Sequence, residues 1–147
     1  DAGETYVIFG RANQIEGTAE ADTLQGTAAM DVLIGGAGAD TLTGGGMSDR
    51  FVYTSAADGG DTITDFTVGD DGDRLDLRDL FADLDYSGID PFGDGWLQTE
   101  QQGDDLAINL DSNGATEGGT TSTLVTLLDV QASDLVALNT LPLGIFE

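Results

Sequence analysis

The sequence contains no cysteine and no histidine, and its only basic residues are four arginines. Without thiols and imidazoles, the chain lacks the common nucleophiles, the usual general base and every common zinc or iron ligand except carboxylate. Four cations cannot neutralise a run of phosphates, which excludes nucleic acid as a partner. No stretch is long and apolar enough to cross a bilayer, so membrane insertion is not expected.

Acidic residues and glycine are abundant instead. The chain of 147 residues carries 28 Asp and Glu, a net charge of -24 and 22 glycines. Repulsion between so many like charges opposes compaction until counter-ions bind. The length suits one domain, or a repeat array with a cap, and we expect a monomer. Since the sequence lacks an initiator methionine, we expect it to be a piece of a larger protein.

A repeat of nine residues organises the chain from Gly17 to Val52. Its four blocks read GTAEADTLQ, GTAAMDVLI, GGAGADTLT and GGGMSDRFV. Glycine is first, aspartate sixth and a large apolar residue eighth in every block. The aspartates are Asp22, Asp31, Asp40 and Asp49, and the apolar residues are Leu24, Leu33, Leu42 and Phe51. A weaker block with Asn13 and Ile15 in the same places precedes them.

This period predicts a stack of short strands joined by tight turns. One inward aliphatic side chain per block cannot form a core alone, so each block must be covered by its neighbours. Successive turns then lie on opposite sides of the stack, which pairs Asp22 with Asp40 and Asp31 with Asp49. Carboxylates and turn carbonyls at one point form a hard oxygen cage that suits Ca²⁺ better than Mg²⁺ or zinc.

The segment from Asp61 to Phe66 follows the last block. As a regular strand it would have no face that is wholly apolar. A kink near Asp65 would bring both Ile63 and Phe66 to the core. Asp61 and Asp65 are then expected to act as a carboxylate pair that closes the open end of the metal ladder.

The rest of the chain predicts a mostly β structure. Residues 4–9 favour a first strand for the stack, and residues 74–81 favour a strand that turns into a short helix. A loop is expected over residues 83–95. Three antiparallel strands are predicted at residues 96–101, 105–110 and 122–130, followed by a helix over 134–138 with Ser133 as its N-cap.

The nonapeptides are followed by Asp49-Arg-Phe-Val-Tyr53, Asp61-Thr-Ile-Thr-Asp-Phe66 and Gly72-Asp-Arg-Leu-Asp-Leu77. Together these motifs resemble the RTX (repeats-in-toxin) C-terminal region of type I secreted proteins. The resemblance is closest to large bacterial RTX adhesins and weaker to serralysin-type proteases and RTX lipases. It implies an all-β fold: a calcium-binding parallel β-roll with an N-terminal strand over residues 1–68, then an antiparallel cap with the secretion signal region over 69–147.

The resemblance also implies ligands for about three to five calcium ions. One ion would take Asp22, Asp40 and the carbonyls of Thr18, Glu20, Gly35 and Ala37. A second would take Asp31, Asp49 and the carbonyls of Thr27, Ala29, Gly44 and Gly46. Asp61 and Asp65 resemble the family's closing site, which can share Asp49. The sequence departs from the family pattern at the second position of two blocks, where Thr18 and Thr27 replace glycine.

The implied function is non-catalytic. The chain would stay unfolded in low calcium, pass an ABC exporter of the type I secretion system that reads its C-terminus, and fold outside a Gram-negative cell, where it would be secreted or surface-bound. One alternative is a ligand-binding adhesive module, and another is the C-terminal part of an RTX protease or lipase with its catalytic domain upstream. Carboxylate pairs for glycoside hydrolysis, Asp83 with Asp85 or Asp104 with Asp105, are weaker candidates because no sugar-binding cleft is evident.

Overall fold

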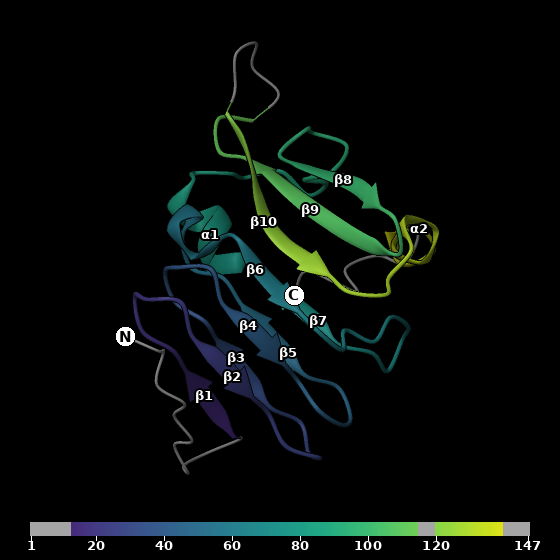
Figure 1. The fold of residues 1–147 in the computed structure, drawn as a ribbon. Helices are drawn as coiled ribbons and strands as arrows, with labels where there is room; N and C mark the ends of the chain where they lie inside the picture. Colours follow the sequence, from purple (N-terminus) through teal and green to yellow (C-terminus); the bar gives the residue numbers. More distant parts are fainter. Residues whose placement is uncertain (1–12, 115–119, 140–147) are drawn as a thin grey trace.

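The computed structural model describes residues 13–114 and 120–139, with side chains to Leu135. Figure 1 shows short strands stacked in the N-terminal half and three longer strands above them. The predicted first strand at residues 4–9 lies outside the described residues. The strands and helices are β1 (Gln14–Glu16), β2 (Thr23–Gln25), β3 (Val32–Ile34), β4 (Thr41–Thr43), β5 (Arg50–Val52), the 3-10 helix η1 (Ala56–Asp58), β6 (Asp61–Ile63), β7 (Arg74–Asp76), α1 (Arg78–Asp83), β8 (Leu97–Gln102), β9 (Asp105–Asp111), β10 (Thr121–Leu127) and α2 (Ala132–Asn139).

The stacked strands form two sheets. The first has four strands in the order β1-β3-β5-β7, and the second has six in the order β2-β4-β6-β10-β9-β8. The strands β1 to β7 alternate between the two sheets, and each of β1 to β5 pairs in parallel with the strand two positions later. Ile15 is therefore in register with Leu33, and Leu24 with Leu42. This arrangement confirms the predicted β-roll and its two-block stacking.

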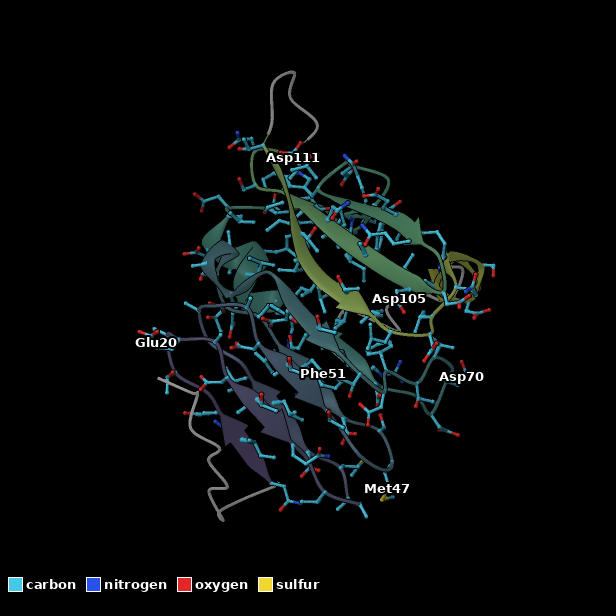
Figure 2. The ribbon with its side chains drawn as sticks, viewed as in Figure 1. Glu20, Met47, Phe51, Asp70, Asp105 and Asp111 are labelled. Atoms are coloured by element: carbon cyan, nitrogen blue, oxygen red, sulfur yellow. The ribbon has the colours of Figure 1, made fainter. Side chains whose placement is uncertain are left out.

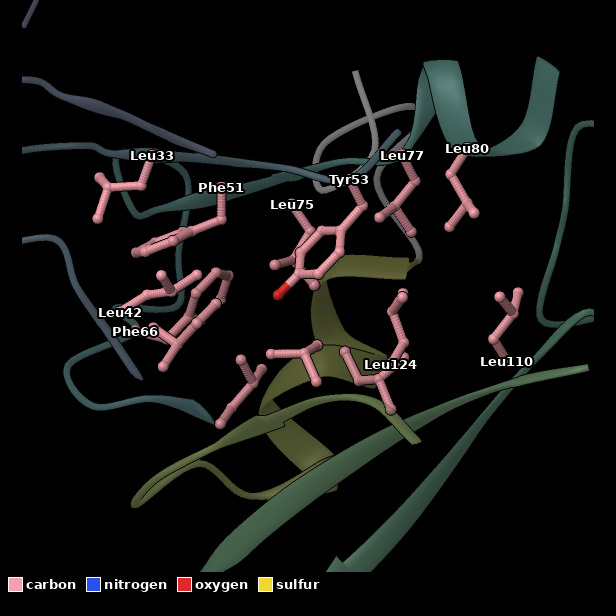
Figure 3. Packing of buried hydrophobic residues seen from close by; sticks show 14 of the residues in the cluster. Leu33, Leu42, Phe51, Tyr53, Phe66, Leu75, Leu77, Leu80, Leu110 and Leu124 are labelled. Atoms are coloured by element: carbon pink, nitrogen blue, oxygen red, sulfur yellow. The ribbon is translucent and has the colours of Figure 1, made fainter. Parts of the chain in front are cut away.

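The core of the roll is built by one inward side chain from each strand. The central residue of every repeat strand is buried and its neighbours are more exposed, as alternation along a strand requires. Leu24, Leu33 and Phe51 are fully buried, and Leu42 is 1% exposed. Figure 3 shows how Leu33, Phe51 and Leu75 follow one another in the core. Stacking thus gives each block the apolar contacts that it cannot make alone.

The segment after the repeats bends as predicted. Strand β6 ends at Ile63, and the chain then bends at Thr64 and Asp65. Ile63 is fully buried and Phe66 is 6% exposed, with its ring centroid 6.0 Å from that of Phe51. The strand-to-helix change predicted over residues 74–81 is also present, as β7 followed by α1.

The three antiparallel strands are present close to their predicted places, with β9 between β8 and β10. Strand β10 ends at Leu127 rather than Val130, and Asp129 just beyond it has a φ of 55° that no strand residue adopts. Helix α2 starts at Ala132, so Ser133 is its second residue and the predicted N-cap is wrong. Strand β10 also pairs in parallel with β6, a contact that the sequence did not predict. None of the described helices has the length and hydrophobicity that a bilayer-spanning segment needs.

Candidate calcium centre

Four glycine-rich turns precede the strands β2 to β5. We number them turns one to four; they comprise residues 17–22, 26–31, 35–40 and 44–49. Turns one and three lie on one side of the roll, and turns two and four on the other. Figure 2 shows Glu20 of turn one and Met47 of turn four at opposite edges, with Phe51 between them.

A ladder of three aspartates runs along the side of turns one and three. The backbone N–H of Asp22 donates to Oδ1 of Asp40 at 2.8 Å, and the N–H of Asp40 donates to Oδ1 of Asp61 at 2.9 Å. These three side chains are between 1% and 3% exposed. We call this row the first ladder. It brings the predicted pair Asp22 and Asp40 together and extends it to Asp61.

The second ladder runs along the other side. The N–H of Asp31 donates to Oδ1 of Asp49 at 2.9 Å, and the N–H of Asp49 donates to Oδ1 of Asp73 at 2.8 Å. Asp73 was missed by the sequence analysis. Its signal is nevertheless present, since Asp73-Arg-Leu75 repeats the spacing of Asp49-Arg-Phe51.

The carbonyls of stacked turns point toward one another. A β-carbon at Gly17 would collide with the Gly35 carbonyl oxygen, and one at Gly36 would collide with the Thr18 oxygen. The Glu20 oxygen lies 2.9 Å from the place of a β-carbon at Gly38. Three of the four carbonyls predicted for the first ion, those of Thr18, Glu20 and Gly35, therefore face the space between turns one and three.

The second side repeats this geometry in part. A β-carbon at Gly26 would collide with the Gly44 oxygen, and one at Gly45 with the Thr27 oxygen. The Thr27 oxygen also accepts a hydrogen bond from the Gly46 N–H at 2.9 Å. The predicted carbonyls of Thr27 and Gly44 thus face the neighbouring turn. The assignment of all eight carbonyls as calcium ligands stays a prediction, including those of Ala29, Ala37 and Gly46.

Asp61 and Asp65 do not form one carboxylate pair. Asp61 is the last rung of the first ladder, whereas the Asp65 carboxylate accepts the N–H groups of Gly44 and Gly45 at 2.8 Å each. Asp65 therefore lies beside turn four, where its charge raises the pKa of Asp49. The chain crosses from one side to the other between these residues, so any closing function is divided between the two ladders.

The ladder carboxylates carry negative charge in a buried environment. Burial raises the pKa of Asp49 to about 6 and that of Asp61 to about 7, although each carboxylate also accepts a ladder hydrogen bond that lowers its pKa. Burial likewise raises the pKa values of Asp40 and Asp73. Oδ1 of Asp22 and Oδ2 of Asp40 are buried without a hydrogen-bond partner. Such oxygens are costly unless a cation or donor reaches them.

Two arginines form ion pairs outside the ladders. Arg50 and Arg78 both pair with Asp76. Arg74 donates to the Asp70 carbonyl oxygen at 2.7 Å.

The donors fit calcium. Between two stacked turns they comprise two carboxylates and several carbonyl oxygens, which is the hard, flexible set that Ca²⁺ prefers. Within the described part of the chain no three carboxylates lie close enough to hold an ion by themselves, so backbone carbonyls must complete any shell. A bound ion would neutralise the ladder charges, while the carbonyls and glycine turns of this chain would set its position.

A parallel roll whose acidic turns stack in register defines a calcium-binding repeat module. Residues 16–50 match the family described as the RTX calcium-binding nonapeptide repeat, in four copies. The R3 subunit of the Azotobacter vinelandii mannuronan C5-epimerase AlgE6 is a similar solved structure, with a TM-score of 0.58 and 30% identity over 92% of this chain and 80% of that one. The chain therefore belongs to the family of RTX calcium-binding repeat modules.

A second subunit of the same epimerase, R2, matches with a TM-score of 0.54 and 29% identity, over 84% of this chain and 83% of that one. No curated protein matches the sequence. Both of these solved structures are epimerase subunits, and the resemblance to adhesins stays a prediction.

Proposed function

We propose that this chain is a non-catalytic module of a larger exported protein and that calcium triggers its folding. The observation that carries the proposal is the pair of ladders: six aspartates, each at most 5% exposed, stacked in two rows. Their burial is unfavourable in the charged state and becomes favourable when a divalent cation neutralises them. RTX repeat proteins are typically secreted by Gram-negative bacteria.

The export route follows from the calcium gradient. In the calcium-poor cytosol the net charge of -24 keeps the chain extended, which suits passage through a type I ABC exporter. Outside, each site filled at ten times its dissociation constant adds about 1.4 kcal/mol of stability. Three to five ions would then add about 4 to 7 kcal/mol, which is comparable to the whole stability of a marginal small domain. The exporter is proposed to read the C-terminal region, of which residues 140–147 lie outside the described ranges.

The similarity to epimerase subunits favours an accompanying enzyme that acts on a polysaccharide. The catalytic part would lie in another segment of the full protein. In this chain the formal hydrolase candidates Asp83, Asp85 and Asp104 are exposed, and Oδ1 of Asp105 accepts the Asp129 N–H at 3.0 Å. These features favour a non-catalytic module over an enzyme.

Circular dichroism during a calcium titration from a chelated start tests the proposal, with magnesium as the control. We expect a transition from coil to β structure with calcium and not with magnesium. Full β structure in chelator would refute calcium-triggered folding. Export is tested separately by deleting residues 135–147 from the full-length protein in cells that carry its exporter. If export is unchanged, the secretion signal does not lie in these residues.

A further inference from the structure

The four turns are of two kinds, which differ at the second position. In turns one and two this position is threonine. The Thr18 N–H and hydroxyl both donate to Oδ2 of Asp22, at 2.5 and 2.9 Å. The Thr27 N–H and hydroxyl donate in the same way to Oδ2 of Asp31, at 2.5 and 3.0 Å. One oxygen of each carboxylate is therefore already held by two donors without any metal.

The same contact occurs once more, outside the repeats. The Thr54 N–H and hydroxyl donate to Oδ2 of Asp58 at 2.7 and 2.8 Å, again four residues apart. Burial acts to raise the pKa of Asp58, but the hydrogen bonds from Thr54 and Ser55 outweigh it and lower the pKa below its usual value. A threonine at this spacing thus stabilises a charged, largely buried carboxylate.

Turns three and four have glycine at the second position and a different backbone. Gly36 and Gly45 have φ values of 89° and 103°, and the fourth positions, Gly38 and Met47, have 114° and 67°. No residue of turns one and two has a positive φ. In turn three, Oδ2 of Asp40 is buried without any hydrogen-bond partner. Oδ1 of Asp22 in turn one is likewise without a partner, so the two kinds of turn differ in the hydroxyl donor and not in having an open oxygen.

We propose that Thr18 and Thr27 grade the calcium affinity along the roll. The inference rests on the proposed calcium function and deepens it. Upstream sites, between turns one and three or two and four, each contain one carboxylate that a threonine already holds. Downstream sites, where turns three and four meet the rungs Asp61 and Asp73, have no such hydroxyl donor among the described hydrogen bonds, although the Thr67 N–H donates to Oδ2 of Asp73 at 2.8 Å. An ion at an upstream site must share a charged carboxylate with a hydroxyl donor, so its affinity is about tenfold lower.

Calcium titration of the ¹⁵N-labelled chain by NMR tests this grading. The backbone amide signals of Thr18 and Thr27 report the upstream sites, and those of Thr62 and Arg74 report the downstream sites. We expect the upstream midpoint at about tenfold higher calcium. A double variant, Thr18→Val and Thr27→Val, keeps the side-chain shape without the hydroxyl and should bring the midpoints within about twofold. The matched control, Thr18→Ser with Thr27→Ser, keeps the hydroxyls and should keep the tenfold difference.

Coinciding midpoints in the unmodified chain would overturn the grading, as would an undiminished difference in the valine variant. Should the double variant fail to fold, Thr18→Val alone decides, because only the upstream site on its own side should then tighten. If Thr18→Val raised the calcium affinity equally on both sides of the roll, this result would contradict the proposal. If no signal responds to calcium, the proposed calcium function itself is refuted. This outcome differs from a failure of the grading alone, in which the signals respond with equal midpoints.

Discussion

Replacing Asp40 by asparagine should change stability in opposite directions with and without calcium. Asp40 is the central rung of the first ladder: its Oδ1 accepts the Asp22 N–H, and its own N–H donates to Asp61. Its second oxygen is buried without a partner. Asparagine keeps the size and the Oδ1 acceptor but removes the charge. The ladder hydrogen bonds can therefore persist while the ion loses a ligand.

The size of the stability loss in calcium depends on how many ions Asp40 would bind. One would lie between turns one and three, and a second would lie between Asp40 and Asp61. At calcium 100-fold above the dissociation constant, each lost ion removes about 2.7 kcal/mol. The loss of one ion should lower the melting temperature in calcium by about 5 to 10 °C, and the loss of both by about twice that. In chelator the variant loses only a buried charge, so its stability should stay equal or rise.

Thermal unfolding followed by circular dichroism measures both effects, in excess calcium and in chelator with an osmolyte that favours the folded state without calcium. Asp71→Asn is the matched control, since Asp71 is an exposed turn residue outside the ladders. It removes the same charge and should shift neither melting temperature by more than about 2 °C. Equal destabilisation of Asp40→Asn in both conditions would show that the carboxylate is only a structural hydrogen-bond acceptor. That result would refute its assignment as a calcium ligand.

Three further predictions concern the turns and the ladder charges. Met47→Gly should stabilise the chain by about 1 kcal/mol in urea unfolding, because Met47 is a non-glycine residue with a φ of 67°; Met30→Gly, also exposed but without positive φ, should not stabilise it. Gly36→Ala should destabilise calcium-bound protein by more than about 2 kcal/mol, since the β-carbon would meet a carbonyl of turn one. Gly103 also has a positive φ, but a β-carbon there would meet open space, so Gly103→Ala should cost only about 1 kcal/mol. Because the pKa of Asp61 is raised to about 7, the calcium-free fold holds protons that the unfolded chain releases near pH 4. Its stability should therefore fall by up to about 1.4 kcal/mol per pH unit and per such group between pH 4 and pH 7. Chemical unfolding without calcium, in an osmolyte that favours the folded state, would contradict the raised pKa if it showed a rise over this range.

The repeat made the stacked part of the fold predictable. A strict period of nine fixes which residues share a side, so the partners of Asp22 and Asp31 followed from arithmetic. The buried apolar positions followed from the same period. Local signals were also sufficient for the kink after Ile63 and for the three antiparallel strands. In these places the residues that form a contact are either close in sequence or related by the repeat.

The downstream rungs could not be predicted in the same way because the spacing changes. Rungs within the repeats are 18 residues apart, but Asp40 and Asp61 are separated by 21 and Asp49 and Asp73 by 24. The additional residues include η1 before β6, and others lengthen the loop before β7. Asp61 and Asp65, four residues apart, therefore resembled a local pair. Their separation becomes visible only when the chain is followed across the roll.

The pairing of β10 with β6 links the antiparallel strands to the ladders. Asp61 is both the last rung of the first ladder and the first residue of β6, in register with Val125 of β10. The junction is extended by hydrogen bonds from Gly60 N–H to the Leu124 oxygen at 2.9 Å and from Leu128 N–H to the Ile63 oxygen at 3.1 Å. A charged, unneutralised Asp61 disfavours burial of this strand, and with it the surface on which β10 pairs. Calcium in the roll should therefore order strands that contribute no ladder carboxylate, because both parts of the chain share β6.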